Sequence, residues 1–438
     1  MENWTSFSTT FLNDNIIFHF TGCTPEKFSV VKVNHENLAV HGELYFLYSL
    51  KSWRSFVFCV EGCTTILQHY AHTHRMRKGD ASTDVTEEIL EHLILKSNNW
   101  PIKIARCMLQ KERVCVFLNR RDIITNSIKM ALDCGRTFGR KLSTGKAFSL
   151  KYQPDAESDL TTQRLHLILN VAAKVLHLQG HVVSDEGNSI GKYIFSSKSE
   201  GPVAEGYKKY ICGVVKNSQS NSKEVCLSWQ QYVEQKMNQV AESSKHELIG
   251  NKEAEENKRF LHNLASAIIT FELIAVKPSR SVVIGNNNLE DNRNVTNTKG
   301  ASFILYNTAR ISTIIAKYNE KVSREEYPSL PNIENVDFSQ LQEEEEWELI
   351  YNFIFGFPQI IDDCLRYEPA FDIYPQMLCL FLSQLCQKFS VYYRRVRILM
   401  EGDHLIPKVI ARLYMLHALQ IVLQNALDIF DIKMESRM

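Results

Sequence analysis

The sequence has no net charge, because 50 Lys and Arg residues balance 50 Asp and Glu residues. A balanced chain has no overall field that attracts nucleic acid, so any binding of anions must come from local basic patches. No apolar run reaches about 18 residues, and we therefore expect no transmembrane helix. The first twenty residues lack a basic segment followed by an apolar one, so no secretory signal is expected either.

Motifs for nucleotide binding and nucleophilic catalysis are also missing. The sequence contains no G-x-x-x-x-G-K-[ST], no G-x-G-x-x-G and no G-x-S-x-G. The pair Gly145-Lys146 lacks the first glycine of a phosphate-binding loop and the Ser or Thr that should follow the lysine. We therefore expect neither a bound cofactor nor a catalytic nucleophile.

The eleven cysteines are odd in number and irregularly spaced along 438 residues. A chain of this length can build a large core, so the cysteines indicate reduced, mostly buried thiols rather than a disulfide framework. We expect the protein in the cytoplasm, with the nucleus as a second compartment.

Two cysteines and three histidines lie together in the stretch CVEGCTTILQHYAHTH, namely Cys59, Cys63, His69, His72 and His74. Mixed Cys and His ligands suit zinc. However, the cysteines lie in or beside a strand-like run, and no second cysteine pair follows at finger spacing. We interpret the cluster as exposed histidines beside core cysteines and expect no metal, with a zinc site as the alternative.

The chain divides into three blocks by composition and periodicity. We expect an α+β domain over 1–146, an α/β domain with a linker over 147–299, and an all-α bundle over 300–438. The first block has strand-like runs at 15–20, 43–50 and 55–60 and a helical stretch near 84–96. Within 101–150, 11 basic residues stand against 3 acidic ones, an excess of 8.

The middle block begins with a strand at 147–152, a helix at 159–178 that ends at Gly180, and a second strand at 181–183. This order predicts a βαβ unit. A charged helical stretch follows at 229–263, and the Asn-rich run at 285–300 is typical of a linker. The last block has helical periodicity at 302–319, 343–367, 374–395 and 405–430.

The last of these helices is amphipathic. Its polar stripe consists of His417, Gln420, Gln424, Asp428 and Asp431, at steps of three or four. The predicted core side carries Leu416, Leu419, Leu423, Ala426, Leu427 and Phe430. Alone, this pattern indicates only a helix that closes a bundle.

The stretch FSVYYRRVRIL at 389–399 places two tyrosines beside three arginines at the predicted end of a helix. Aromatic rings can stack on unpaired RNA bases, and arginine binds phosphates. The alternative is a solvated basic turn whose tyrosines lie half in the core.

The C-terminal block resembles the DALR anticodon-binding domain of arginyl-tRNA synthetase. The matching residues are Gly300, Leu305, Tyr306, Ala309, Arg310 and Ile311, then Phe357-Pro358, then Arg412, Leu413, Ala418, Val422, Leu423, Asn425, Leu427 and Asp428. Ala426 replaces the family's glycine, and the ending ESRM is similar to the family's terminal E-R-M.

The likeness continues upstream in a weaker form. The stretch 113–139 resembles the end of the family's N-terminal additional domain, which grips the outer corner of tRNA. The stretch 147–183 resembles the start of a class I catalytic domain, but Thr161-Thr162 stand where its signature should end in Gly-His. The loop at 217–224 lacks the family's K-M-S-K motif. Threonine cannot supply an imidazole to stabilise the adenylation transition state, so we expect a degenerate, truncated Rossmann-like domain without catalysis.

Similarity to the non-catalytic relatives of this enzyme implies a tRNA-binding adapter. It would recognise arginine tRNAs and present them to a tRNA methyltransferase that makes 3-methylcytidine in the anticodon loop; composition and spacing show nothing of that step. The alternatives are a protein-interaction scaffold that binds no RNA, and a residual arginyl-tRNA synthetase-like enzyme.

Two sets of side chains would contact the tRNA in this interpretation. The anticodon set is Tyr306, Arg310, Tyr392, Tyr393, Arg394, Arg395, Arg397, Arg437 and Met438. The set for the tRNA body, acting mainly through phosphates, is Lys103, Arg106, Lys111, Arg113, Arg120, Arg121, Arg136, Arg140 and Lys141.

Overall fold

The computed structural model describes residues 6–25, 29–59, 62–75, 85–184, 189–243, 254–284 and 300–434. Most of the predicted linker at 285–300 therefore lies outside the described residues, as do Arg437 and Met438. The chain forms two compact units, one from 1–129 with 336–356 and one from 130–335 with 357–438. The three-part division drawn from the sequence stays a prediction, because compactness and sequence likeness divide a chain by different criteria.

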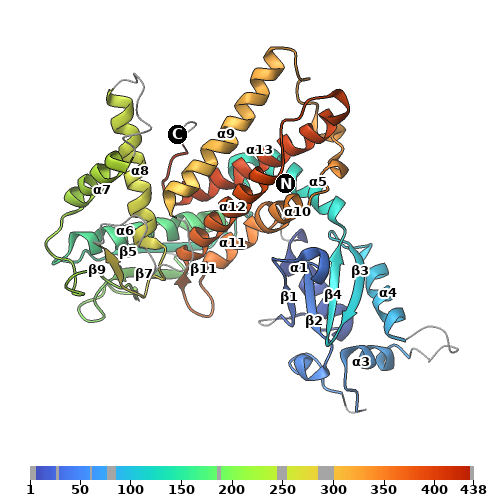
Figure 1. The fold of residues 1–438 in the computed structure, drawn as a ribbon. Coiled ribbons are helices and arrows are strands. Elements are labelled where there is room, and N and C mark those ends of the chain that lie inside the picture. The colour runs from blue at the N-terminus through green and yellow to red at the C-terminus, as the bar shows by residue number, and fades with distance from the viewer. Residues whose placement is uncertain are drawn as a thin grey trace. The chain divides into compact units, whose positions relative to one another are not determined.

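The first unit is built around an antiparallel sheet with the strand order β1-β2-β4-β3 (Figure 1). Its strands are β1 (Val31–Val33), β2 (Leu44–Leu47), β3 (Ile104–Gln110) and β4 (Arg113–Leu118). Its helices are α1 (Thr9–Thr21), α2 (Leu38–His41), α3 (Ile66–Thr73), α4 (Val85–Ser97) and α10 (Glu344–Leu349), with a 3-10 turn at Leu50–Trp53 and a π-helical turn at Ile350–Phe355. Helix α5 (Arg120–Cys134) begins here and ends in the second unit.

Two strands predicted in this unit are wrong. The run at 15–20 belongs to α1, because Ser8 caps the helix by accepting from the Phe11 amide, and Leu12 and Ile16 are buried one turn apart. The run at 55–60 is not a strand over its described residues but a turn and loop that follow the 3-10 turn. Apolar and aromatic residues alone did not separate helix, strand and loop at this length.

A buried carboxylate attaches 344–355 to the sheet of the first unit. Glu43 is fully buried, and its oxygens accept from the Leu118 amide at 2.8 Å and the Trp347 indole at 2.9 Å. The Arg120 Nε lies 3.3 Å from the same carboxylate. Burial raises the pKa of Glu43, although these three donors act against that rise.

The second unit contains a parallel sheet with the strand order β6-β5-β7-β8. Its strands are β5 (Ala147–Tyr152), β6 (Val182–Val183), β7 (Gly191–Ser196) and β8 (Lys208–Ile211). Two short pairs are formed by β9 (Val215–Asn217) with β10 (Val282–Ile284), and by β11 (Leu365–Arg366) with β12 (Asp372–Ile373). The helices are α6 (Asp159–Leu178), α7 (Trp229–Ser243), α8 (Ala254–Ile274), α9 (Ala301–Ser323), α11 (Phe357–Cys364), α12 (Pro375–Arg395) and α13 (Ile406–Ile429).

The predicted βαβ unit is confirmed, because β5 and β6 pair in parallel on either side of α6. The helix ends as the sequence indicated. Gly180 has φ +83°, its amide bonds to His177 O at 3.1 Å, and the His181 amide bonds to Leu176 O at 2.9 Å. A Cβ at Gly180 would lie 2.0 Å from the Leu142 carbonyl oxygen, so only glycine fits here.

Helix α13 lies at the centre of the helical part of the second unit. Its six predicted core residues are all buried, and the polar stripe from His417 to Asp428 is the less buried side. Burial extends further, however: Ala411, Met415, Ala418 and Val422 are fully buried on the remaining side. By length and composition alone, the segment Asp403–Ile429 could cross a membrane. A helix buried in the core of a bundle has the same apolar composition, and most of the apolar side chains of α13 are buried in this way.

Candidate nucleic-acid interface

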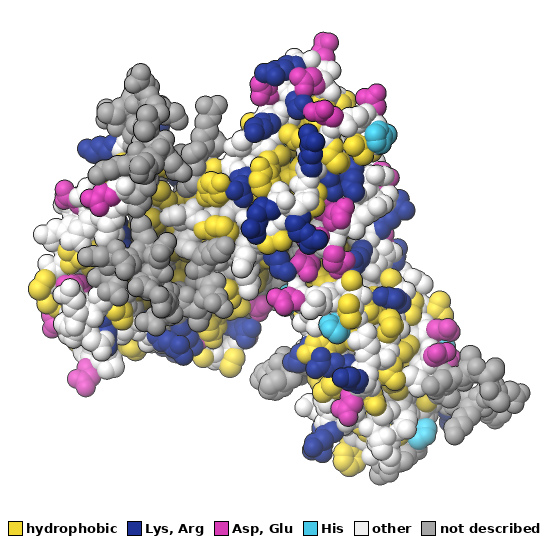
Figure 2. Space-filling model, viewed as in Figure 1, with side chains coloured by type: hydrophobic (Ala, Val, Ile, Leu, Met, Phe, Trp, Pro, Cys, Tyr) yellow, Lys and Arg dark blue, Asp and Glu magenta, His cyan; other side chains and the backbone are white. Residues whose placement is uncertain are grey.

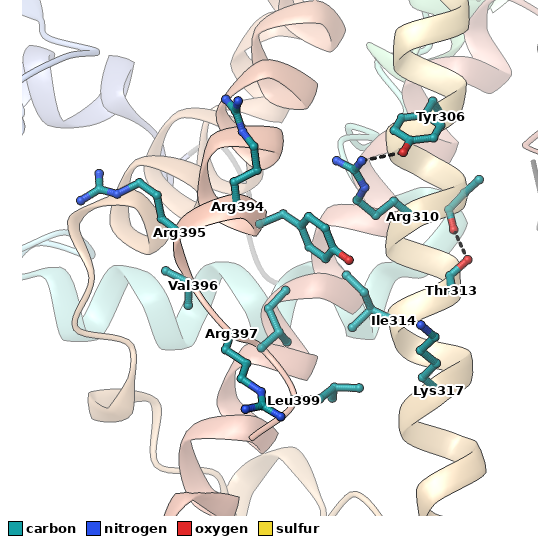
Figure 3. Close-up of a pocket in the computed structure, with 13 residues that line it drawn as sticks. Tyr306, Arg310, Thr313, Ile314, Lys317, Arg394, Arg395, Val396, Arg397 and Leu399 are labelled. Carbon is teal, nitrogen blue, oxygen red and sulfur yellow. Dashed lines mark hydrogen bonds between the residues drawn. The ribbon is translucent and has the colours of Figure 1, made fainter. Parts of the chain in front are cut away.

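A basic groove of about 660 Å³ lies between α9 and the C-terminal end of α12 with the loop that follows it (Figure 3). Six predicted anticodon-binding residues line it: Tyr306, Arg310, Tyr393, Arg394, Arg395 and Arg397. Among the described residues that line the groove, five are cations and none carries a carboxylate. Figure 2 shows Lys and Arg side chains among apolar ones over this body of the molecule.

The α9 wall of the groove follows the helical repeat. Tyr306, Arg310, Thr313 and Lys317 succeed one another at steps of four, three and four, so their side chains share one face. Lys317 and Thr313 were missed by the sequence interpretation. The same spacing, extended from Tyr306 and Arg310, could have found both.

Arg310 lies between two tyrosine rings. Its guanidinium carbon is 4.5 Å from the ring centroid of Tyr306 and 4.6 Å from that of Tyr393. Its Nη2 donates to the Tyr306 hydroxyl at 2.8 Å, which fixes the guanidinium plane. Tyr306 and Tyr393 remain 48% and 40% exposed. The three side chains therefore form a preorganised stack with aromatic surface open to solvent.

The basic loop that follows α12, residues 396–400, is fixed by hydrogen bonds to its backbone. Arg412 of α13 is 2% exposed, and its Nη1 donates to the Arg397 carbonyl oxygen at 3.1 Å. The Tyr327 hydroxyl donates to the Met400 carbonyl oxygen at 2.8 Å. Arg397 itself points outward and lies 3.8 Å from Glu401 in a largely exposed pair, which contributes little to stability. Arg412 thus positions the loop without facing the groove.

One predicted contact residue is wrong. Tyr392 is fully buried, so its ring cannot reach RNA, while its neighbour Tyr393 faces the groove. Successive residues of a helix point about 100° apart, and the sequence did not show which tyrosine faces the core.

The basic block at 101–150 does not form one patch within either unit. Lys103, Arg106, Lys111, Arg113, Arg120 and Arg121 belong to the first unit, whereas Arg136, Arg140 and Lys141 belong to the second. Several of these residues bind carboxylates of their own unit: Lys103 with Asp122 at 3.3 Å, Lys141 with Asp362 at 2.7 Å, and Arg136 with Asp428.

Arg120 has a structural role that the sequence did not reveal. It donates to both carboxylate oxygens of Glu344, at 2.6 and 3.0 Å, and lies 5.0 Å from the Trp347 ring. A bidentate pair of this kind is among the stronger polar contacts and leaves few donors for a phosphate. Arg106 and Arg113 lie over Phe117 and Tyr45, at 3.9 and 4.6 Å.

The start of α6, where catalysis would be expected in a class I synthetase, is filled by contacts within the chain. Thr161 is fully buried, and its hydroxyl accepts from the Val215 amide at 3.1 Å. The Thr162 hydroxyl accepts from the Asp155 amide at 2.9 Å. Asp155 in turn binds Lys223, the lysine of the 217–224 loop, at 2.7 Å.

The pKa shifts of Asp155 and Lys223 show that their ion pair is favourable. Burial alone would raise the pKa of Asp155, but Lys223, Ser197 and the Glu157 amide outweigh it and hold that pKa below its usual value. The pKa of Lys223 is raised, because Asp155 and Glu157 together outweigh the effect of its burial. The carboxylate and the ammonium group therefore satisfy each other.

Comparison with known proteins places the groove in a recognised domain. Residues 304–438 match the family model described as the DALR anticodon binding domain. The chain is 30% identical over 225 residues to DALR anticodon-binding domain-containing protein 3 of Danio rerio, covering 50% of this chain and 39% of that protein. It is 32% identical over 169 residues to the protein of that name from Rattus norvegicus, covering 37% and 31%.

Arginine--tRNA ligase of Borreliella burgdorferi is 27% identical over 186 residues, covering 42% of this chain and 28% of that enzyme. The alignments thus span about a third of these relatives' own lengths. Among solved structures, the arginyl-tRNA synthetase of Thermus thermophilus superposes with a TM-score of 0.63 at 9% identity, covering 98% of this chain and 100% of that one. The enzyme of Plasmodium falciparum gives 0.61 at 10% identity, covering 100% and 99%. The chain therefore has an arginyl-tRNA synthetase-like fold and ends in a DALR anticodon-binding domain.

Proposed function

We propose that this protein is a non-catalytic tRNA-binding adapter, which recognises arginine tRNAs and presents them to a tRNA methyltransferase for formation of 3-methylcytidine in the anticodon loop. The observation that carries the tRNA-binding part is the Tyr306–Arg310–Tyr393 stack within a basic groove of the DALR domain. The methyltransferase partner rests on the resemblance to the non-catalytic relatives.

The chemistry of the groove suits an unpaired loop of RNA. Bases splayed from an anticodon loop can stack on exposed aromatic faces, each stack contributing about 1–3 kcal/mol. Arg394, Arg395, Arg397 and Lys317 surround the stack with positive charge that can neutralise phosphates. Because the chain has no net charge, this local patch would provide the electrostatic attraction.

The contacts at the start of α6 support a non-catalytic role. In the resemblance to a class I synthetase, Thr161-Thr162 stand where Gly-His would end the signature, so Thr162 takes the place of an imidazole that would stabilise an adenylation transition state. The hydroxyls of both threonines accept from backbone amides instead. The loop lysine Lys223 is bound to Asp155 and so is withdrawn from any nucleotide. This part of the chain would act as a spacer or as the docking surface for the methyltransferase.

Binding of purified arginine tRNAs over a salt series tests the first step. Changing Arg394, Arg395 and Arg397 together to Ala should weaken binding and reduce the slope of log affinity against log salt by about 0.7–0.9 for each lost phosphate contact. A matched control removes three cations of the same unit outside the groove, Arg324, Arg366 and Lys198. Equal affinity and equal slope for the two triple variants would remove the groove from the binding site.

The alternatives have distinct readouts. A scaffold without RNA binding would give no shift of arginine tRNA in a gel. A residual synthetase would catalyse arginine-dependent exchange between ATP and pyrophosphate. For the adapter, adding the chain to a methyltransferase and an arginine tRNA should increase 3-methylcytidine, and the groove variant should lose that increase.

A further inference from the structure

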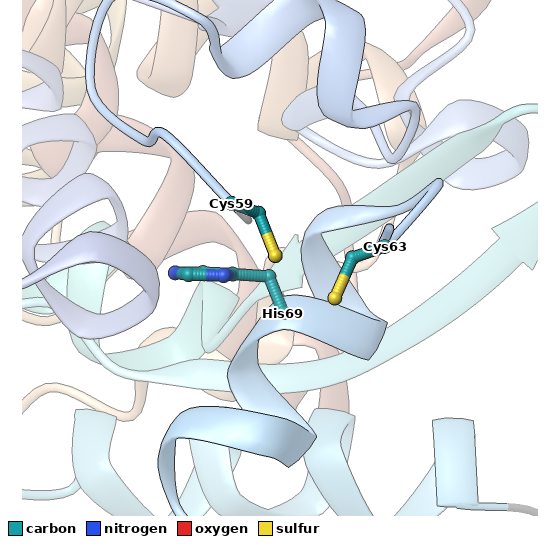
Figure 4. Close-up of side chains that lie close together, drawn as sticks. All are labelled: Cys59, Cys63 and His69. Carbon is teal, nitrogen blue, oxygen red and sulfur yellow. The ribbon is translucent and has the colours of Figure 1, made fainter. Parts of the chain in front are cut away.

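The loop between the 3-10 turn at Leu50–Trp53 and α3 brings two thiols and an imidazole together (Figure 4). The ligand atoms of Cys59, Cys63 and His69 all lie within 4.8 Å of one another. Neither cysteine is a core residue, since both are half-buried, which corrects the interpretation from sequence. His72 adds a second imidazole, with its Nδ1 3.1 Å from the Cys63 sulfur.

The backbone that follows Cys63 is fixed by hydrogen bonds. The Leu50 amide donates to the Thr64 carbonyl oxygen at 2.9 Å, and Thr64 N and Oγ1 both bond to the Gln68 side chain. The Thr65 side chain caps α3. These bonds hold Cys63 at the start of the helix that carries His69.

Helix α3 presents its histidines away from the core. Its buried residues are Ile66, Leu67, Tyr70 and Ala71, so the helix is anchored by that side. His69 and His72 are one turn apart and share a second side, which faces the cysteine loop. His74 is not part of this cluster. Its ring stacks on Tyr70 at 4.0 Å, and its Nδ1 lies 3.0 Å from the Tyr70 carbonyl oxygen.

We propose that Cys59, Cys63 and His69 bind a structural Zn²⁺ ion, with His72 as the fourth ligand. Tetrahedral zinc with thiolate and imidazole ligands needs donor atoms about 3.3–3.8 Å apart, from bond lengths of about 2.3 and 2.0 Å. The upper limit of 4.8 Å between the three ligand atoms exceeds that spacing by about 1 Å. The C-x3-C separation falls within the usual range for zinc sites, whereas the two histidines are closer in sequence than in a finger because one helical turn spaces them.

The metal would also stabilise a loop that side-chain packing holds only weakly. Phe58, next to Cys59, is 90% exposed, so this aromatic side chain contributes little to the core. Binding energy from zinc contributes directly to folding where a preformed core is small. This site lies in the first unit, whereas the residues of the basic groove belong to the second.

Zinc content of the untagged full-length chain tests the site. We expect about one Zn²⁺ per chain after removal of loosely bound metal, and Co²⁺ substitution should give the visible bands of a tetrahedral thiolate site. Cys63→Ser and His69→Gln should reduce zinc to near zero, whereas Cys63→His, which keeps a ligand, should retain it. His72→Gln should lower zinc affinity.

Matched controls are His74→Gln and Cys23→Ser, which change a neighbouring histidine and an exposed cysteine of the same unit. Both should keep full zinc. Metal-free wild-type protein that gains no Co²⁺ bands, or a Cys59–Cys63 disulfide in freshly purified protein without zinc, would overturn the proposal. Full zinc affinity in His72→Gln would remove His72 from the ligand set. Because Cys63→Ser and Cys63→His change the same position, loss of zinc through misfolding would appear in both.

Discussion

The guanidinium carbon of Arg310 on α9 lies 4.6 Å from the centroid of the Tyr393 ring on α12. This contact joins two helices that line the basic groove, and the Tyr393 side chain remains 40% exposed to solvent. A base that stacks on Tyr393 would therefore meet a ring that is already oriented, so little rotamer entropy is lost on binding.

Tyr393 and Tyr392 should respond to substitution in opposite ways. Tyr393→Leu removes a stacking face and should weaken binding of arginine tRNA by about 1–3 kcal/mol, with little change in melting temperature. Tyr392→Leu removes a fully buried ring and should destabilise the fold by a few kcal/mol, about the cost of other core truncations, without changing the affinity of the folded protein. Thermal unfolding and tRNA binding measured on both variants check this; a loss of affinity confined to Tyr392→Leu would contradict it.

Arg412 should act on tRNA binding as a positioning residue. Arg412→Met removes the hydrogen bond to the Arg397 carbonyl oxygen and should weaken binding, although the side chain is buried away from the groove. Tyr414→Phe is the control, because it deletes a hydrogen bond from the same helix to Pro331. Both should lower stability by about 1 kcal/mol or more, but only Arg412→Met should change affinity and the salt slope. Identical binding curves would assign Arg412 to stability alone.

Gly180→Ala should destabilise the second unit more than Gly145→Ala. Both glycines have positive φ, +83° and +68°, and alanine in that region costs about 1–2 kcal/mol. A Cβ at Gly180 would also clash with the Leu142 carbonyl, whereas nothing lies within 4 Å of one at Gly145. Denaturant unfolding of the two variants gives the difference, and equal destabilisation would show that the backbone at the junction between α6 and β6 shifts to accommodate the added Cβ.

The first unit should lose stability as pH falls from about 6.5 toward 4. Burial, aided by the nearby charges of His74, His92 and Lys96, lowers the pKa of His19 to about 4. In that window the unfolded chain binds a proton that the folded chain excludes, so the free energy of unfolding declines with falling pH by at most about 3 kcal/mol. His19→Phe keeps a ring stacked on Tyr70 and should flatten this part of the profile. Parallel pH profiles for the two proteins would refute the assignment.

Residue order determined much of the fold and part of the groove. The helices at 159–178 and 374–395 were predicted within a residue of their bounds, because apolar spacing, Gly180 and Pro375 mark their ends. The tyrosines and arginines of 392–397 were singled out by type and neighbourhood, and Tyr306 and Arg310 by the resemblance to the DALR domain; of these, the structure brings Tyr306, Arg310, Tyr393, Arg394, Arg395 and Arg397 to one groove. Such local signals are sufficient where the apolar face of a single helix, or the residues at its ends, determine the structure.

Tertiary packing decided what local patterns left open. The run at 15–20 became a helix because a cap and the core of the first unit favour it, and Tyr392 was buried because α12 turns that side toward the bundle. The same packing brought the ligand atoms of Cys59, Cys63 and His69 within 4.8 Å of one another, and placed Arg412 against the Arg397 carbonyl, which no motif in the sequence indicated. Sequence periodicity specifies which side of an element is apolar, whereas the partner that covers each side, and the side chains that meet there, follow from how the elements pack.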